Sequence, residues 1–192
     1  GAYFDHGPRP TPAIRDGKVY VHNTDGYLVC LNLQTGDKIW SHHPKSDFAS
    51  SGTWHGCVAS PLLTERLLIL PVGGTNAGGI VAYALGDGRP VWHVLGEKAS
   101  ASTPVLRTIN GRQEILVVTR EAMHGLDPVD GRDIWRWPTR KQSSGNVYAA
   151  SPVVVGDQIF LSGWYKLGGL LLSVKNGQPE KRWHLDDALS SH

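Results

Sequence analysis

The chain has 192 residues, 40% of them hydrophobic, and a formal net charge of +2. That much apolar material can build a packed core, which excludes an intrinsically disordered chain. A charge this close to zero, with acids and bases interspersed, excludes the basic surface of a nucleic-acid-binding protein. The longest apolar runs, such as 67–72 and 170–174, are too short to cross a bilayer, so we expect no transmembrane segment.

One pattern occurs four times along the chain: a Ser/Thr-Pro pair, then, roughly thirty residues later, a tryptophan just past a glycine turn. The pairs begin at Thr11, Ser60, Thr103 and Ser151. The structural residues of this repeat are the glycines and tryptophans Gly36, Trp40, Gly88, Trp92, Gly131, Trp135, Gly177 and Trp183. Self-similarity at a fixed spacing is the sequence signature of a repeat architecture.

The first copy shows what one repeat builds. Short β-branched and aromatic runs at 11–14, 18–22, 27–33 and 37–40 are separated by Asp-Gly or Thr-Gly pairs. Such runs predict an antiparallel meander of four strands, and no part of the chain shows convincing helical periodicity. Repeats of about 40 to 50 residues with four strands are typical of propeller blades. The predicted fold class is therefore all-β, a β-propeller of four-stranded antiparallel blades.

The tryptophans fit the packing of such blades. One sheet cannot bury both of its faces, so each blade depends on its neighbours. We expect each indole to be buried there, with its N–H donating to a backbone carbonyl of the next blade. The glycine before each tryptophan is expected to have a positive φ in the hairpin turn.

The repeat also resembles a known family. Residues 30–40 read Cys-x-Asn-x-x-Thr-Gly-x-x-x-Trp, which is similar to the Trp-docking motif of the pyrroloquinoline-quinone-like (PQQ-like) β-propellers, approximately Ala-x-Asp-x-x-Thr-Gly-x-x-x-Trp. Matches recur at 82–92 and 125–135, and the copy at 171–183 carries a two-residue insertion. The chain is most similar to the non-enzymatic, exported bacterial members, a group that includes the outer-membrane β-barrel assembly lipoprotein.

The resemblance implies where function should be sought. Enzymes of this family hold their quinone beside an adjacent Cys-Cys pair, with a calcium ion bound by Glu, Asn and Asp and a catalytic Asp. Here Cys30 and Cys57 are far apart, and no position matches the calcium or catalytic motif. We therefore assign no catalytic, cofactor-binding or metal-binding residue and expect no cofactor. Similar proteins are usually exported, which implies a periplasmic, cell-surface or secreted location.

The repeat spacing also gives the domain organisation. The predicted blades are 9–43, 58–95, 100–138 and 148–185, within a single propeller over 1–192. Residues 186–192 resemble the lead-in to a further blade, so we expect the chain to be part of a propeller of six to eight blades.

Candidate binding residues lie where the chain enters each blade and at one hairpin tip. If the first strand of each blade lines the central channel, these lead-ins converge on one face and present aromatic, amide and imidazole groups. The alternative is that they only seal the packing between blades. The candidates are His6, Arg9, Trp54, His55, Asn146 and Tyr148, with Trp164 and Tyr165 at the tip.

Three functions remain open from the sequence. The leading hypothesis is a non-catalytic scaffold or binding module with a protein or peptide partner. The second is part of a PQQ- and calcium-dependent dehydrogenase whose active site lies mainly outside this segment. The third is a carbohydrate-binding propeller that uses Trp54, Tyr148 and Trp164.

Overall fold

The computed structural model describes residues 9–50, 57–74, 78–139, 148–163 and 168–185. These residues form four antiparallel sheets of four strands each, which confirms the predicted fold class. The sequence patterns did not indicate the one short helix, α1 (Pro44–Asp47), which is a single turn after the first sheet. The described part of the chain contains no helix with the length and apolar character needed to span a bilayer.

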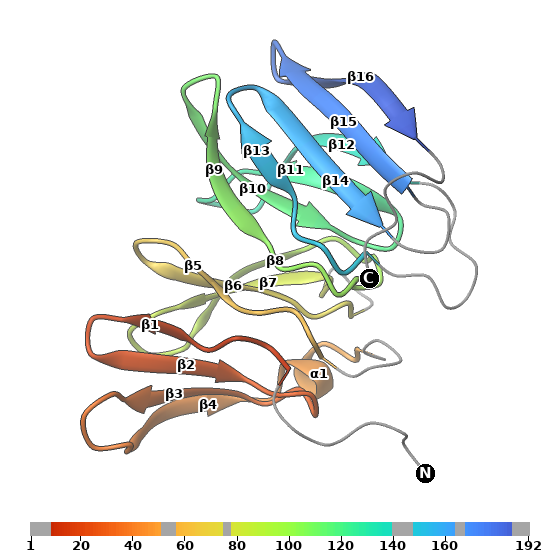
Figure 1. Cartoon of the computed structure of the whole chain (residues 1–192). Coiled ribbons are helices and arrows are strands. Elements are labelled where there is room, and N and C mark those ends of the chain that lie inside the picture. The colour runs from red at the N-terminus through yellow and green to blue at the C-terminus, as the bar shows by residue number, and fades with distance from the viewer. Residues whose placement is uncertain (1–8, 51–56, 75–77, 140–147, 164–167, 186–192) are drawn as a thin grey trace. The chain divides into compact units, whose positions relative to one another are not determined.

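Each sheet is an up-and-down meander of consecutive strands (Figure 1). The first sheet consists of β1 (Ala13–Arg15), β2 (Lys18–His22), β3 (Leu28–Asn32) and β4 (Lys38–His42). The second consists of β5 (Leu62–Leu63), β6 (Leu67–Pro71), β7 (Ile80–Ala84) and β8 (Pro90–Val94). The third consists of β9 (Val105–Ile109), β10 (Arg112–Val118), β11 (Ala122–Leu126) and β12 (Asp133–Pro138). The fourth consists of β13 (Val153–Val155), β14 (Gln158–Gly163), β15 (Gly168–Lys175) and β16 (Gln178–Leu185).

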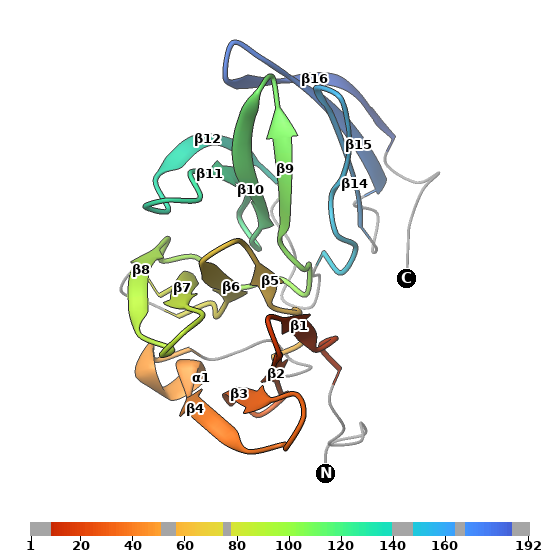
Figure 2. The ribbon, with the colours of Figure 1, turned by 90° about the vertical axis from the view of Figure 1, so that its left-hand side faces the viewer.

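The chain divides into two compact units, Gly1–Ala99 and Ser100–His192, and each unit contains one pair of sheets. The two sheets of each pair are neighbours (Figures 1 and 2). In each pair, an apolar core draws side chains from both sheets. The core of the first pair consists of Tyr20, Leu28, Cys30, Trp40, Leu68, Leu70, Val72, Val81, Tyr83 and Leu85. The core of the second pair consists of Ile109, Leu116, Val118, Met123, Trp135, Tyr148, Ile159, Leu161, Leu172 and Val174.

The repeat tryptophans occupy the same register position in all four sheets. Each one pairs with the third strand, opposite Cys30, Ala82, Gly125 or Leu171 in turn. A β-bulge follows that pair in every sheet, so the residue before the tryptophan is left out of the ladder. The turn between the third and fourth strands of each sheet contains a glycine with positive φ, as predicted: the angles are 75°, 74°, 73° and 74° for Gly36, Gly88, Gly131 and Gly177.

Trp40 contacts the second sheet as the packing argument predicts. Its Nε1 donates a hydrogen bond to the carbonyl oxygen of Leu85 at 3.4 Å, and the hydroxyl of Tyr20 donates to the same oxygen at 3.2 Å. The indole also lies against Gly88 in the β7–β8 turn, where a Cβ atom would come within 2.6 Å of Trp40 Cδ2. One carbonyl and one glycine of the second sheet therefore fix the indole of the first.

The fourth sheet departs from this pattern. The two-residue insertion lengthens the β15–β16 hairpin by the pairs Val174↔Pro179 and Lys175↔Gln178, and a two-residue turn closes it. A Cβ atom added to Gly177 in that turn would meet nothing within 4 Å, unlike one at Gly88. The expectation that every repeat indole is buried is wrong for Trp183, which is 38% exposed because no further sheet follows it among the described residues.

The contact between Gly88 and Trp40 predicts a difference between two glycine substitutions. Gly36→Ala places a Cβ at positive φ in open space and should lower the free energy of unfolding by about 1 kcal/mol. Gly88→Ala adds a collision with a buried ring and should cost about 2–4 kcal/mol in total. Urea unfolding followed by circular dichroism measures both. Equal losses would show that the indole does not rest on Gly88.

Burial of His22 predicts that stability depends on pH. His22 is 1% exposed, and its Nδ1 lies 3.3 Å from the carbonyl oxygen of Ala59; because a carbonyl only accepts, Nδ1 carries the proton. Burial lowers the pKa of this imidazole from 6.5 to about 4. Between these two pH values His22 is therefore protonated in the unfolded chain and neutral in the folded chain. The stabilising effect is complete above about pH 6.5 and is lost as the pH falls toward 4.

The free energy of unfolding should fall by about 2 kcal/mol between pH 7.5 and pH 5 through this group. Urea titrations at the two pH values measure the change. His22→Gln, which keeps a donor for Ala59, should flatten the pH dependence, whereas His93→Gln at an exposed position should leave it unchanged. The same slope in His22→Gln as in the parent would contradict this assignment.

Candidate functional site

Most candidate binding residues from the sequence lie outside the described residues. This holds for His6, Trp54, His55, Asn146, Trp164 and Tyr165. Arg9 is described and is exposed at the entry to the first sheet. Tyr148 is described at the entry to the fourth sheet.

Tyr148 is a packing residue in the second pair of sheets. It is 5% exposed, belongs to the apolar core, and its carbonyl oxygen accepts a hydrogen bond from the backbone N–H of Ala101 at 2.9 Å. Its side chain also lines a hollow of about 410 Å³ beside Trp137, Lys181 and His184. The Tyr148 carbonyl thus links the two lead-ins of this unit, and the role of its side chain in binding stays a prediction.

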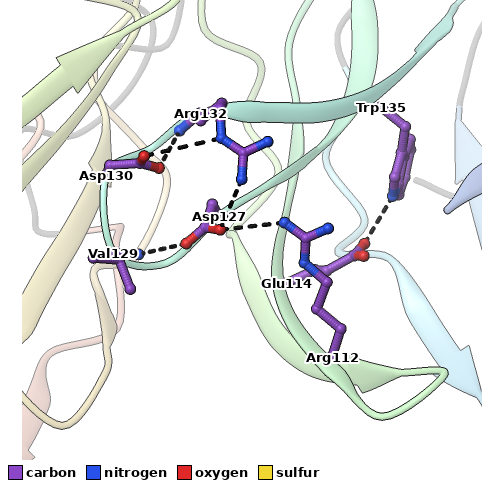
Figure 3. Close-up of polar contacts among 7 residues, drawn as sticks. All are labelled: Arg112, Glu114, Asp127, Val129, Asp130, Arg132 and Trp135. Carbon is purple, nitrogen blue, oxygen red and sulfur yellow. Dashed lines mark hydrogen bonds and ion pairs between the residues drawn. The ribbon is translucent and has the colours of Figure 1, made fainter.

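Trp135 lies in the second pair as Trp40 lies in the first, but its N–H has a different partner. Its Nε1 donates to Glu114 Oε2 at 2.7 Å (Figure 3). Glu114 is on β10 of the same sheet, so the predicted bond to a carbonyl of the next sheet is wrong here. Gly125 explains the change: a Cβ there would lie 2.3 Å from Trp135 Nε1, so only glycine lets the indole fold over its own sheet.

The carbonyl that would have received the Trp135 N–H has another donor. Leu85 lies three residues after Ala82, the strand partner of Trp92, and Val174 lies three residues after Leu171, the strand partner of Trp183. Val174 of β15 therefore corresponds to Leu85 of the second sheet. The Val174 oxygen accepts a hydrogen bond from Asn110 Nδ2 at 2.7 Å. Asn110, in the β9–β10 turn, thus replaces the indole as the polar link between the two sheets.

The turn after β11 carries an ordered ionic network, also drawn in Figure 3. Asp127 Oδ1 accepts the backbone N–H of Val129 at 3.0 Å, and Oδ2 lies 3.2 Å from Arg112 Nη2 and 3.3 Å from Arg132 Nη2. The Val129 N–H and then the two guanidinium groups lower the pKa of Asp127. These contacts show why an acid ends the third strand here: it closes the turn.

A hollow of about 610 Å³ lies between the third and fourth sheets, at the end where the lengthened hairpin turns. Its lining includes the buried carboxylate of Glu114, which is 2% exposed, and the half-buried Asp157. The other lining residues are Ile109, Asn110, Arg112, Val174, Lys175, Asn176 and Gly177. The repeat pattern does not single out Glu114, although an acid beside the apolar run of β10 is a visible signal.

The hollow offers acceptors and fixed charges but no arrangement typical of catalysis. Among the described residues, no group of three or more His, Cys, Asp or Glu side chains could hold a metal ion. Cys30 and Cys57 are both buried free thiols, and burial raises the pKa of each. Glu114 is the most deeply buried charged residue of the lining.

The Trp135–Glu114 bond predicts which of two substitutions at Glu114 lowers the free energy of unfolding more. Glu114→Gln keeps a side-chain oxygen as acceptor and should lower the free energy of unfolding by less than about 1 kcal/mol. Glu114→Leu leaves the buried indole N–H without an acceptor and should cost about 1–3 kcal/mol. Urea unfolding gives the energies, and the Trp135 indole N–H resonance, assigned with Trp135→Phe, should move further in Glu114→Leu, which removes the acceptor, than in Glu114→Gln, which keeps one. A loss as large in Glu114→Gln would contradict this role.

Comparison with known proteins places these blades in a family. A family model described as outer membrane protein assembly factor BamB matches residues 2–192. Four-stranded meanders with this repeat are β-propeller blades, and the chain belongs to the outer membrane protein assembly factor BamB family.

Individual relatives include two kinds of protein. An outer membrane protein assembly factor BamB of Xanthomonas campestris is 32% identical over 87 residues, 45% of this chain and 21% of that protein. The quinohemoprotein alcohol dehydrogenase of Comamonas testosteroni is 28% identical over 146 residues, 68% of this chain and 20% of that protein. The crystal structure of BamB from Moraxella catarrhalis superposes with a TM-score of 0.66 at 17% identity, covering 91% of this chain and 51% of that one.

These coverages mean that the chain spans about a fifth of these two curated relatives and about half of the solved structure. At 17% identity the structural likeness concerns the fold alone.

Proposed function

We propose that this chain is part of a non-catalytic β-propeller that acts as a scaffold or protein-binding module in the bacterial envelope. The supporting observation is how the repeat residues are used. Trp40 and Trp135 are 8% and 3% exposed, and both indole N–H groups are bonded within the protein. The Trp40 contacts with Leu85 and Gly88 support interpreting the repeat as a Trp-docking motif, whose work is to join blades.

The family and its named relatives suggest the process served. Relatives named outer membrane protein assembly factor support a role in assembling outer membrane proteins, from the periplasm or the cell surface. The four blades then belong to one larger propeller. Its protein or peptide partner would meet the lead-in residues and the hairpin tip, of which Arg9 is exposed in the structure.

Disrupting the gene in its own bacterium tests this function. If the protein helps assemble outer membrane proteins, the amount of folded outer membrane protein in the envelope should fall, and the wild-type gene should restore it. Heat-modifiable mobility of these proteins on gels measures the folded fraction. A complementing copy with a photo-cross-linker at position 9 should form an adduct with an envelope protein. Unchanged folded protein together with no adduct would contradict the proposal.

The second candidate is a segment of a quinone-dependent dehydrogenase, favoured by the similarity to the Comamonas testosteroni enzyme over 146 residues. Reconstituting the full-length protein with pyrroloquinoline quinone and Ca²⁺, then assaying dye-linked oxidation of primary alcohols, separates the two functions. Turnover that requires both additions would favour the dehydrogenase. Its absence, alongside a positive gene-disruption result, would favour the scaffold.

A further inference from the structure

The hollow between the third and fourth sheets contains an acid that the protein does not neutralise. Glu114 Oε2 accepts the Trp135 N–H, whereas no described residue is seen to donate to Glu114 Oε1, which is not an enclosed atom and opens to the hollow. Asp157, on the same lining, forms no side-chain ion pair within the described ranges. A buried carboxylate with one oxygen open to the hollow can accept a charge-assisted hydrogen bond from a cation there.

The basic residues of the lining are paired with other acids. Arg112 precedes Glu114 by two positions on β10, but its Nη2 lies 3.2 Å from Asp127 Oδ2. Lys175 Nζ lies 3.7 Å from Glu180 Oε2 on the other strand of its hairpin. The two basic side chains of the lining are therefore each paired with an acid outside the lining, whereas the lining itself contributes the buried carboxylate of Glu114 and the half-buried carboxylate of Asp157.

The hollow exists because three sequence changes coincide. Gly125 lets the indole lie over its own sheet, Asn110 takes the Val174 carbonyl, and the insertion carries the β15–β16 turn away from the indole. In the first pair of sheets the corresponding turn touches the indole through Gly88, and the Leu85 carbonyl receives both Tyr20 and Trp40. At this position the second pair of sheets therefore has a hollow lined by charged side chains, whereas the first pair has a packed indole.

From this arrangement we propose that the hollow is a binding site for an organic cation, an ammonium or guanidinium group. The Glu114 Oε1 atom accepts its hydrogen bond, and the carboxylate of Asp157 lies along the same lining. A volume of about 610 Å³ accommodates a basic side chain with its flanking backbone or a small free amine. The site is independent of the envelope role proposed above, because it depends only on the second pair of sheets.

The test uses the full chain labelled with ¹⁵N and follows the Trp135 indole N–H, which reports directly on the Glu114 carboxylate. Butylguanidinium and butylammonium should shift this resonance saturably, with a Kd of about 1 mM, whereas the neutral isostere butylurea should not. Glu114→Gln should raise the Kd about tenfold or more while the protein remains folded at the temperature of the titration, as circular dichroism checks. Asp157→Asn should weaken binding less, and Glu65→Gln, an exposed acid in the other unit, should not change it.

Two peptide arms identify the source of the cation. Acetyl-Gly-Arg-Gly-amide is compared with the same peptide carrying citrulline, the neutral isostere of arginine. Tighter binding of the arginine peptide than of butylguanidinium supports a basic side chain of a partner protein, and binding of butylguanidinium alone supports a small amine. Shifts from butylurea equal to those from the cations, no saturable shift with any cation, or unchanged affinity in both Glu114→Gln and Asp157→Asn would overturn the proposal.

Discussion

The structure depends on the fact that a four-stranded sheet cannot bury its own apolar face. Each core described above draws its side chains from two sheets, so neither sheet could keep its leucines, valines and indole out of water alone. Burying an indole stabilises the pair only if its N–H is bonded, because an unpaired buried donor costs about 1–3 kcal/mol. The positions of Trp40 and Trp135 are therefore set jointly by apolar contact and by the nearest acceptor. The expected bond to a carbonyl is wrong for Trp92, whose buried Nε1 has no partner among the described residues and which bears that cost.

The two pairs of sheets satisfy that requirement in different ways. In the first, the acceptor is the backbone carbonyl of Leu85, which any sequence supplies, and the indole reaches it across the interface. In the second, the acceptor is a side chain, Glu114, and the indole bonds within its own sheet. A backbone carbonyl is a neutral acceptor, whereas a carboxylate acceptor places a negative charge at the interface between the two sheets. The second solution therefore changes the chemistry of the interface while preserving its packing.

These two cases explain what could be predicted from the sequence. Strands such as β2 (Lys18–His22) were predicted with their observed bounds because the Asp-Gly pairs that end them are local signals. The partner of Trp135 could not be predicted, since it depends on Glu114, 21 residues away, and on the missing Cβ of Gly125. Glu114 was overlooked because an acid in a strand ordinarily faces solvent. The lead-in candidates were chosen from loops, and only Arg9 and Tyr148 of them lie in the described part of the chain.

The residues that reveal the family carry little information about function. The chain is similar to an assembly factor and to an alcohol dehydrogenase alike, so the repeat architecture by itself does not separate these functions. Trp40 and Gly88 are engaged in the contact between two blades and have no remaining surface with which to distinguish ligands. What distinguishes this chain must therefore lie where it departs from the repeat. Within the described residues, one such departure is the lengthened β15–β16 hairpin, whose turn lines the same hollow as the buried carboxylate of Glu114.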